Sequence, residues 1–281
     1  MSIAIENVDI HGWEAAIRGA RNPMNSWEKS DSWFIGSWNS EMEELRCHSL
    51  NINGATMKET GELTNDGHLV MEVMWMTLNA EGESEWPTIT IPWPYAEDEN
   101  YKYCIKLILG PNDHKLLKNL CKGGSEESKW RRFVHVSMDI TAPLYWWKEF
   151  ETYKVGTACN SCSTMHKIQA KEFTLEDFSR EHLSGIDIGQ GVGAPHQNLK
   201  NTIRMLNECR GLFIITKNKD YWWQMIQLLP TSYNQRRTID LNYEVLAKQY
   251  RERKSHKLDE WREYCEWIKT LPYSELITME E

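Results

Sequence analysis

No apolar run in the sequence is long enough to cross a membrane, and no charged-then-apolar leader follows Met1. A membrane helix needs about 20 predominantly apolar residues, and a secretory signal needs an apolar core behind a basic start. Internal repeats, coiled-coil heptads and low-complexity segments are absent as well. We therefore expect a globular protein that does not enter a membrane, and we expect it in the cytoplasm.

Positive charge is also scarce. The 281 residues contain 32 Lys and Arg against 41 Asp and Glu, which gives a formal net charge of −9 at pH 7. A protein that binds long nucleic acid neutralises phosphates with clustered basic side chains. The charge balance therefore argues against long nucleic acid as a partner, while a small anionic ligand in a local pocket stays possible.

The cysteines do not form a disulfide framework. There are seven, an odd number, scattered through a chain that is 41% hydrophobic and large enough to build a core without staples. This pattern predicts reduced thiols. The length suits one large domain, or one domain that carries an insertion, and we expect most of the 14 tryptophans to pack in a core or an oligomer interface.

Alternating apolar and polar residues predict a β-rich insertion at about 33–98. Its short runs, such as 69–78 and 88–91, are separated by turn residues such as Asn53-Gly54, which favours antiparallel strands. Elsewhere, apolar spacing predicts strands at 101–109 and 133–140 and helices at 12–20, 112–121, 196–210, 219–229 and 238–253. In the last of these helices, Asn242 and Arg253 are about three turns apart and would project from one face.

Residues 139–167 are interpreted as the active-site segment. A strand end leads into a helix that starts at Pro143 and carries an aromatic stripe, and about ten small polar residues follow. This composition is unusual for a connector. The glycine-rich stretch 185–193 superficially resembles a phosphate loop, but no clear strand precedes it and the later motif spacing is missing, so we interpret it as a flexible loop.

Cys159 and Cys162, followed by His166, have the spacing of half a zinc site. A structural zinc site needs a fourth ligand, and none is evident, so we expect no metal. Three alternatives stay open: a redox dithiol, two packing residues, or a functional cysteine that lines a ligand pocket. A cysteine nucleophile would need a neighbour that favours the thiolate, and Lys154 or His166 is close in sequence.

Candidate anion contacts are Lys154, Arg236 and Arg237, because a guanidinium offers two parallel donors to a phosphate. A basic pair at a helix start more often simply faces solvent. The same interpretation applies to the basic run 251–256, which would ordinarily be a solvent-facing helix end.

Two separated stretches resemble the flavin-dependent thymidylate synthases. The family signature reads Arg-His-Arg-x-x-Ser-x-Asn-Glu-x-Ser-x-Arg-Tyr, where x is any residue. It follows a helix that starts at a proline and contains Arg-Gln-Trp. The corresponding positions here are Lys148-Glu149-Phe150, Thr152-Tyr153-Lys154, Thr157, Cys159-Asn160, Cys162 and Thr164-Met165. The more specific match comes later, at Leu229-Pro230, Asn242, Leu246, Arg253, Ser255, His256 and Trp261.

The resemblance implies an α+β fold, a mixed sheet flanked by helices as in this family, in one domain over 1–281 with the β-rich insertion. It implies that Arg253 orients the pyrimidine beside FAD. By the same resemblance, Tyr153, Lys154, Thr157, Asn160, Asn242 and His256 would contact the cofactors, and Cys162, Thr164, Arg236, Arg237 and Arg253 would contact the substrate. Because the family's sites are built between subunits, a homo-oligomer is expected, and specifically a tetramer.

Several departures bear on the substrate. The first signature Arg is Thr152, and two phosphate-binding arginines of the family correspond to Thr164 and Ile226. A buried phosphate dianion without paired donors is costly. Either Arg236, Arg237 or Arg21 compensates, or the substrate differs from dUMP.

The family makes dTMP from dUMP with methylenetetrahydrofolate, NADPH and FAD. The resemblance therefore implies reductive one-carbon transfer to C5 of a pyrimidine deoxynucleotide, dUMP or a relative, by a flavin-dependent methyltransferase. Arg253, Lys154 and Cys162 are the candidate catalytic residues, Cys162 through covalent attack on the ring. The alternatives are a nucleotide-binding protein of the same fold that has lost this chemistry and an interaction module built on the insertion.

Overall fold

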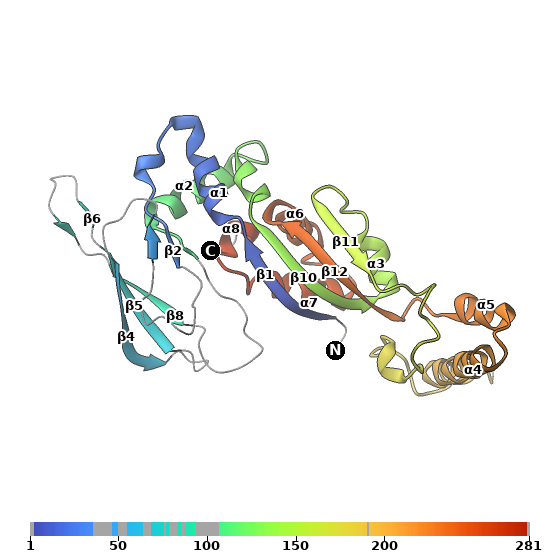
Figure 1. Ribbon diagram of the computed structural model, residues 1–281. Helices are drawn as coiled ribbons and strands as arrows, with labels where there is room; N and C mark the ends of the chain where they lie inside the picture. The colour runs from blue at the N-terminus through green and yellow to red at the C-terminus, as the bar shows by residue number, and fades with distance from the viewer. Residues whose placement is uncertain are drawn as a thin grey trace. The chain divides into compact units, whose positions relative to one another are not determined.

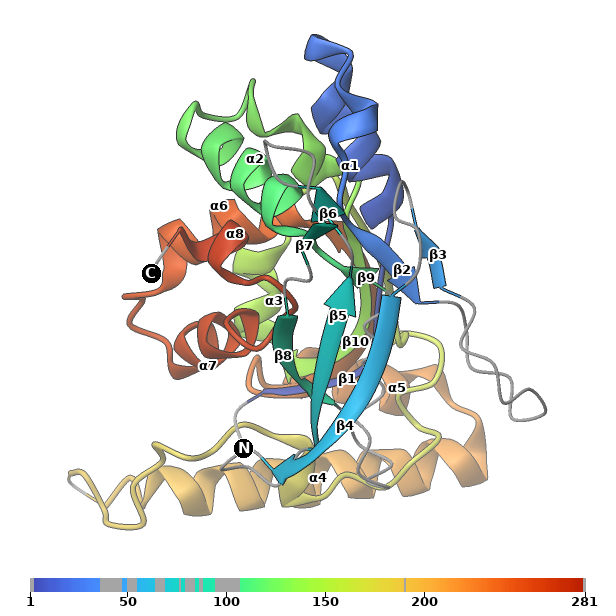
Figure 2. The same ribbon diagram turned by 90° about the vertical axis from the view of Figure 1, so that its left-hand side faces the viewer.

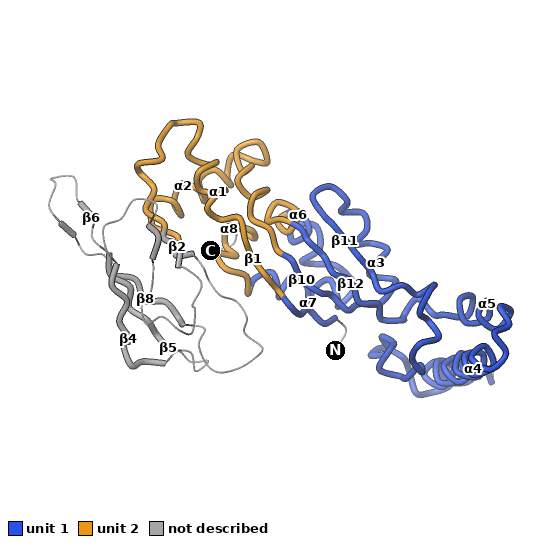
Figure 3. The backbone as a smooth tube through the Cα atoms, in the orientation of Figure 1, with its two compact units in different colours: residues 1–7, 137–241, 248–269 blue, residues 8–136, 242–247, 270–281 orange. Residues whose placement is uncertain are grey.

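The computed structural model of the chain describes residues 3–35, 47–49, 55–63, 69–75, 77–78, 84–85, 88–93, 107–189 and 191–279. The chain divides into two compact units, drawn in different colours in Figure 3. Unit 1 comprises residues 1–7, 137–241 and 248–269, and unit 2 comprises residues 8–136, 242–247 and 270–281.

A four-stranded antiparallel sheet, most of whose residues belong to unit 1, has the strand order β1-β10-β12-β11 (Figure 1). Its strands are β1 (Ala4–His11), β10 (His135–Pro143), β11 (Thr157–Ser161) and β12 (Asn234–Asn242). The pattern at 133–140 is confirmed, because Val134, Val136, Met138 and Ile140 are all fully buried on one face of the strand. The expected α+β fold, a sheet flanked by helices, is also confirmed.

Helices α3 (Leu144–Phe150) and α7 (Asp259–Ile268) cover one face of this sheet (Figures 1 and 2). Pro143 precedes α3 with φ −68° and ψ 149°, an extended conformation that ends β10. The aromatic stripe expected for α3 is buried at Trp146, Trp147 and Phe150. The rings of Trp146 and Phe150 pack with Trp261 and Tyr264 of α7 at centroid distances between 4.8 and 6.2 Å, so aromatic packing fixes the helix pair.

Two further helices of unit 1, α4 (Pro195–Thr216) and α5 (Lys219–Leu228), share a hydrophobic core. They enclose Leu199, Ile203 and Leu206 of α4 with Met225 of α5. Their spacing along α4 follows the helical period. The starts of both expected helices are confirmed, but α4 continues to Thr216 where the sequence predicted an end near 210. Residues 185–189 and 191–193 contain no helix or strand, as expected for a loop.

Unit 2 contains α1 (Trp13–Arg21), α2 (Pro111–Lys122) and α8 (Glu275–Thr278), with short 3-10 turns at Asn22–Met24, Trp27–Lys29 and Ser128–Arg132. The apolar face predicted for the first helix, Trp13, Ala16, Ile17 and Ala20, is buried. Tyr243, the first residue of α6 (Tyr243–Arg253), packs edge-on against Trp13 at 5.3 Å. The first helix was therefore predicted correctly, both in position and in the face it buries.

Antiparallel strands account for the described residues between 33 and 93, as the alternating runs predict. The strands are β2 (Trp33–Ile35), β3 (Cys47–Ser49), β4 (Ala55–Leu63), β5 (Leu69–Trp75), β6 (Thr77–Leu78), β7 (Ser84–Glu85) and β8 (Thr88–Trp93), with β9 (Leu107–Ile108) later in the chain. They pair as β3-β2-β9, β4-β5-β8 and β6-β7, and Figure 2 shows β4, β5 and β8 side by side. Most of the strand expected at 101–109 lies outside the described residues.

A buried polar network joins the chain on both sides of these strands. The Asp113 carboxylate accepts hydrogen bonds from the Arg21 guanidinium at 2.6 Å and from the Ser30 and Ser32 hydroxyls at 2.8 and 2.6 Å. Asp31 in turn accepts from the backbone N–H of Asp113 at 2.9 Å. Burial raises the pKa of Asp31, while its backbone hydrogen bonds oppose that rise. The two ends of the stretch from 33 to 108 are therefore fixed to each other.

The helix expected at 238–253 was wrong in its first turn. Residues up to Asn242 belong to β12, and the helix α6 begins at Tyr243. Ile239 and Leu241 are buried with the period of two that defines a strand. Ile239 also falls on the helical stripe with Tyr243 and Leu246, which explains the error.

Candidate functional site

Five side chains gather near the ends of α3, α6 and α7 in unit 1, and we call them the Glu149 cluster: Glu149, Tyr153, Arg253, His256 and Trp261. One oxygen of Glu149 accepts from Arg253 Nη1 at 2.8 Å and from the Trp261 indole at 3.1 Å. His256 Nε2 lies 3.4 Å from the same oxygen. The His256 Nδ1 accepts from the backbone N–H of Leu258 at 3.2 Å, so Nε2 carries the proton and donates toward Glu149.

Arg253 is held on three sides. Its guanidinium carbon lies 4.8 Å from the Trp261 ring and 5.7 Å from the Tyr153 ring, both within cation–π range. Its Nε donates to the Tyr153 hydroxyl at 2.9 Å. The side chain is 19% exposed, so an external ligand can still reach a guanidinium whose orientation is fixed.

The Tyr153 hydroxyl accepts from Arg253, and it donates to Glu252 at 2.8 Å. Burial raises the pKa of Tyr153, the hydrogen bond from Arg253 lowers it, and the hydrogen bond to Glu252 raises it. The phenol is therefore a neutral link between the arginine and a second carboxylate.

Arg237 forms a second stacked arginine. It lies 4.4 Å over the Trp147 ring and donates to Glu151 at 2.7 Å and to the Gln235 side chain at 3.0 Å. The same guanidinium is 3.9 Å from the Cys159 sulfur. Arg237 is paired to Ser161 across the β11–β12 ladder, so it lies beside the strand that carries the family-like signature.

Arg236 is the adjacent residue on β12 and is also paired. It donates to Asp139 at 2.7 Å and lies 3.2 Å from Glu6. Hydrogen bonds from Thr238, Arg236 and Asn7 lower the pKa of Asp139 to about 2. Asp139 is thus ionised and hydrogen-bonded to these donors. Arg236 is in turn paired with the Asp139 and Glu6 carboxylates.

The signature positions Thr157, Asn160 and Cys162 lie on β11 or directly after it. The sequence did not predict this strand, because Thr-Ala-Cys-Asn-Ser has no apolar alternation and its residues are mostly exposed at the sheet edge. Asn160 pairs with Thr238. The Thr157 hydroxyl is buried and has no hydrogen-bond partner among the described residues.

The strand geometry decides among the alternatives for Cys159 and Cys162. Residues three apart on an extended chain point to opposite faces and are separated by roughly 10 Å, too far for a disulfide. In this conformation the two thiols are not joined in a disulfide. Both thiols are exposed, which also excludes the interpretation as buried packing residues.

Three other predicted residues lie on the loop after α3 or directly after β11. Lys154 is exposed directly after Tyr153, and Thr164 is half-buried after Cys162. Cys162 has a fixed backbone, since its N–H donates to the Arg236 carbonyl at 3.0 Å and its carbonyl accepts from Gln235 at 2.7 Å.

The expected placement of Asn242 is corrected, and Arg21 is already paired. Asn242 is not on the helix with Arg253: it ends β12, is buried, and its side chain accepts from the Val245 N–H at 3.1 Å, which caps α6. Arg21, one of the arginines considered for phosphate, is 4% exposed and bound to Asp113. Its charge is therefore already balanced inside unit 2.

The sequence did not predict the roles of Glu149, Glu151 and Trp147. Glu149 had appeared only as a position in the signature. Its pairing with Arg253 joins residues 104 apart in sequence, and no local pattern indicates such a pair.

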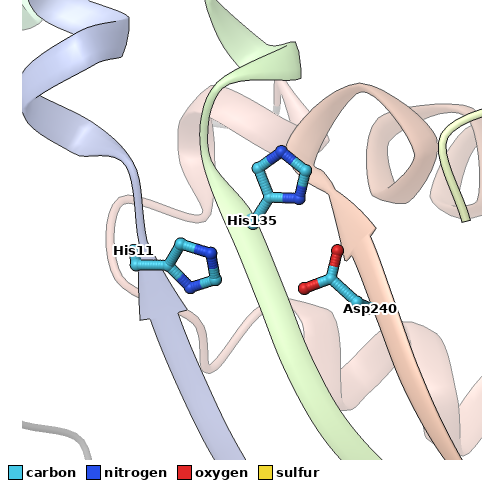
Figure 4. A group of neighbouring side chains, drawn as sticks. All are labelled: His11, His135 and Asp240. Carbon is cyan, nitrogen blue, oxygen red and sulfur yellow. The ribbon is translucent and has the colours of Figure 1, made fainter. Parts of the chain in front are cut away.

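Two histidines also lie close together. His11 on β1 and His135 on β10 stack with ring centroids 5.5 Å apart and an interplanar angle of 14°. Figure 4 draws both rings and Asp240 on β12. The Asp240 carboxylate accepts from the Ser137 hydroxyl at 2.6 Å. None of these three was singled out from the sequence.

The chain has an α+β fold that is similar to the fold of flavin-dependent thymidylate synthases. A crystal structure of thymidylate synthase X (ThyX) from Helicobacter pylori with FAD and dUMP aligns with a TM-score of 0.53 and 12% identity, over 100% of this chain and 97% of that chain. A second structure of the same enzyme complexed with FAD and dUMP aligns at 0.51 and 12%, over 100% and 98%. At this identity the likeness is one of fold.

A UMP/dUMP methylase, PolB from Streptomyces cacaoi bound with 5-Br UMP, aligns with a TM-score of only 0.44 and 14% identity, over 60% of this chain and 83% of that chain. That likeness is too slight to carry an argument. No family model matches the sequence, and no curated protein matches it. None of the helices in the described part of the chain is long and apolar enough to span a membrane.

Proposed function

We propose that the protein is a divergent flavin-dependent enzyme of the thymidylate synthase type, which transfers a one-carbon unit from methylenetetrahydrofolate to C5 of a pyrimidine deoxynucleotide. dUMP or a related nucleotide is the substrate. The observation that supports this most is Arg253, stacked between two aromatic rings and bound by Glu149, at the position that resembles the family's pyrimidine-orienting arginine. We also propose that the enzyme is located in the cytoplasm.

The residues around β11 fit a flavin. The Thr157 hydroxyl is a buried polar atom without a partner among the described residues, and the exposed Asn160 on the same strand offers an amide. With Tyr153, Lys154 and His256 they would hold FAD. Bound FAD, reduced by NADPH, supplies the hydride.

The chain's own residues then orient and polarise the pyrimidine. Arg253 donates hydrogen bonds to the ring carbonyl and stabilises negative charge that develops there. Its stacked position means that little reorganisation is needed when the charge appears. Lys154, exposed on the loop after α3, contributes a second positive charge to the cofactor or the substrate.

A homo-oligomer, specifically a tetramer, is part of the proposal. Helices α4 and α5 carry exposed apolar side chains on the faces turned away from their shared core, including Met205, Leu212, Ile215 and Trp223, the last two 80% and 48% exposed. Exposed apolar patches of this kind mark association surfaces. A second copy of this chain would bury them.

The visible spectrum of the purified protein tests the proposal. We expect a yellow protein whose flavin absorption changes when dUMP or another pyrimidine nucleotide is added. Light scattering on the same sample should give a mass several times 33.1 kDa. A colourless protein that cannot be reconstituted with FAD would reject the flavin enzyme.

A second function is favoured by one observation. Arg236, Arg237 and Arg253 are each paired with a carboxylate, and Thr152 and Thr164 replace arginines of the signature. A protein that kept the fold and binds a nucleotide without the chemistry would have these features. It would bind nucleotide but neither flavin nor folate, so the spectrum distinguishes it from the enzyme.

Replacing Cys162 with serine is expected to abolish turnover. In this proposal the Cys162 thiolate adds to the pyrimidine ring and is released again when the product forms. Cys159→Ser on the same edge strand is the matched control and should retain turnover, since that thiol lies on the other face. Full activity of Cys162→Ser would reject a covalent role.

A further inference from the structure

Two carboxylates, Glu149 in the last turn of α3 and Glu151 directly after the helix, each bind one arginine of the site. Glu149 binds Arg253, and Glu151 binds Arg237 at 2.7 Å. Each arginine in turn stacks on a tryptophan, Trp261 at 4.8 Å and Trp147 at 4.4 Å. The two arrangements have the same three components, a carboxylate, an arginine and an indole ring.

In both arrangements the arginine is the more enclosed partner. The side chain of Arg237 is 11% exposed against 55% for Glu151, and that of Arg253 is 19% exposed against 36% for Glu149. The stack fixes the guanidinium plane, and the carboxylate occupies donors that an anionic ligand would otherwise use. An incoming phosphate would have to displace a carboxylate that is already in place.

The third arginine of the candidate site is balanced in the same way. Arg236 contacts Asp139 and Glu6. Selective binding of a phosphate dianion requires donors whose charge exceeds that of the surrounding carboxylates. Here every one of these arginines has a carboxylate partner, and the whole chain carries a net charge of −9.

We propose that Glu149 and Glu151 are specificity-determining residues. They make the site recognise the nucleoside part of a pyrimidine nucleotide, so that the 5′-phosphate adds almost no affinity. The nucleoside and the 5′-monophosphate then bind with nearly equal affinity. This inference rests on the proposed function, because it takes the ligand to be a pyrimidine nucleoside or nucleotide. It adds that the ring and sugar, and not the phosphate, are what the site recognises.

Direct binding to the full-length protein tests the inference without needing turnover. Isothermal titration with 2′-deoxyuridine and with dUMP should give dissociation constants within about threefold of each other, with little dependence on salt. A dUMP affinity more than about tenfold that of deoxyuridine overturns the inference and leaves the proposed function standing. If neither ligand binds at millimolar concentration, the proposed function and the inference both fail.

The second measurement is the ligand affinity of variants in which the carboxylate paired with an arginine has lost its charge. Glu149→Gln and Glu151→Gln keep the shape of the side chain but remove the charge that balances Arg253 or Arg237. We expect each to raise the ratio of dUMP affinity to deoxyuridine affinity about three- to tenfold. A loss of packing would affect both ligands equally, so this difference separates a charge effect from a structural one.

Glu266→Gln is the matched control. Glu266 pairs with Lys269 on the exposed surface of unit 1, so this change alters the net charge by the same amount away from the arginines. It should leave the ratio of the two affinities unchanged. An equal gain for dUMP in Glu266→Gln, or no gain in either glutamate variant of α3, contradicts the specificity role.

Discussion

Replacing Asp113 with alanine is expected to lower the free energy of unfolding by about 3–5 kcal/mol, because it leaves a buried arginine without its counter-charge. Asp113 is fully buried and Arg21 is 4% exposed. Thermal or urea unfolding of the variant, followed by circular dichroism, measures the loss.

The contacts of Asp113 explain the size of the effect. Besides Arg21, its carboxylate accepts from two serine hydroxyls and from the backbone N–H groups of Asp31 and Ser32 at 3.1 and 3.0 Å. Each buried donor left without a partner costs free energy of its own. Space is also tight, since a Cβ on Gly110 would clash with the Asp31 carbonyl oxygen.

Two further variants show whether the charge is responsible. Glu126→Gln breaks the exposed pair with Lys129 and should not change stability measurably, because exposed pairs contribute little. The double variant Arg21→Met/Asp113→Leu removes both charges and should recover much of the loss. If Asp113→Ala unfolds within 1 °C of the unchanged protein, the network is not stabilising.

The parts of the fold that were predictable from sequence are those with local periodicity. The alternation through Val134, Val136, Met138 and Ile140 identified the central strand, and the spacing of Trp13, Ala16 and Ile17 identified α1, because each pattern reports one buried face. Such patterns survive without knowledge of the partner element. They located the frame on which the candidate site is built.

The errors occurred where local pattern and tertiary position disagree. Residues 157–161 form an edge strand with few apolar residues, so nothing in their composition distinguishes them from a loop. Ile239 satisfies a helical and a strand period at once, and only its pairing with Cys159 resolves the choice. Long-range hydrogen bonding decides both cases.

The candidate site shows the same limit. Arg253 and His256 were identified by their position in a family-like motif, and the structure places both against Glu149. Glu149 itself could not be assigned a role, because a carboxylate on an exposed helix position is ordinarily solvated. What makes it different is an arginine and a tryptophan from another part of the chain.

Replacing Arg253 with lysine is expected to reduce turnover by roughly 10²- to 10³-fold, the loss that follows removal of one positioned donor at a developing charge. Lysine keeps the positive charge, but it has no planar fork and cannot bind Tyr153 and Glu149 while stacking on Trp261. The kcat and KM of one-carbon transfer to dUMP, measured with FAD, NADPH and methylenetetrahydrofolate, would report the change.

The proposed role predicts how that loss divides between the two constants. An arginine that stabilises charge only during the reaction lowers kcat, with a smaller effect on KM, whereas one that only binds the ring raises KM. Arg251→Lys, an exposed position on the same helix, is the control and should leave both constants unchanged. If Arg253→Lys folds, keeps its flavin and turns over within threefold of the unchanged protein, Arg253 does not act on the pyrimidine, and its contacts with Glu149 and Trp261 serve the fold alone.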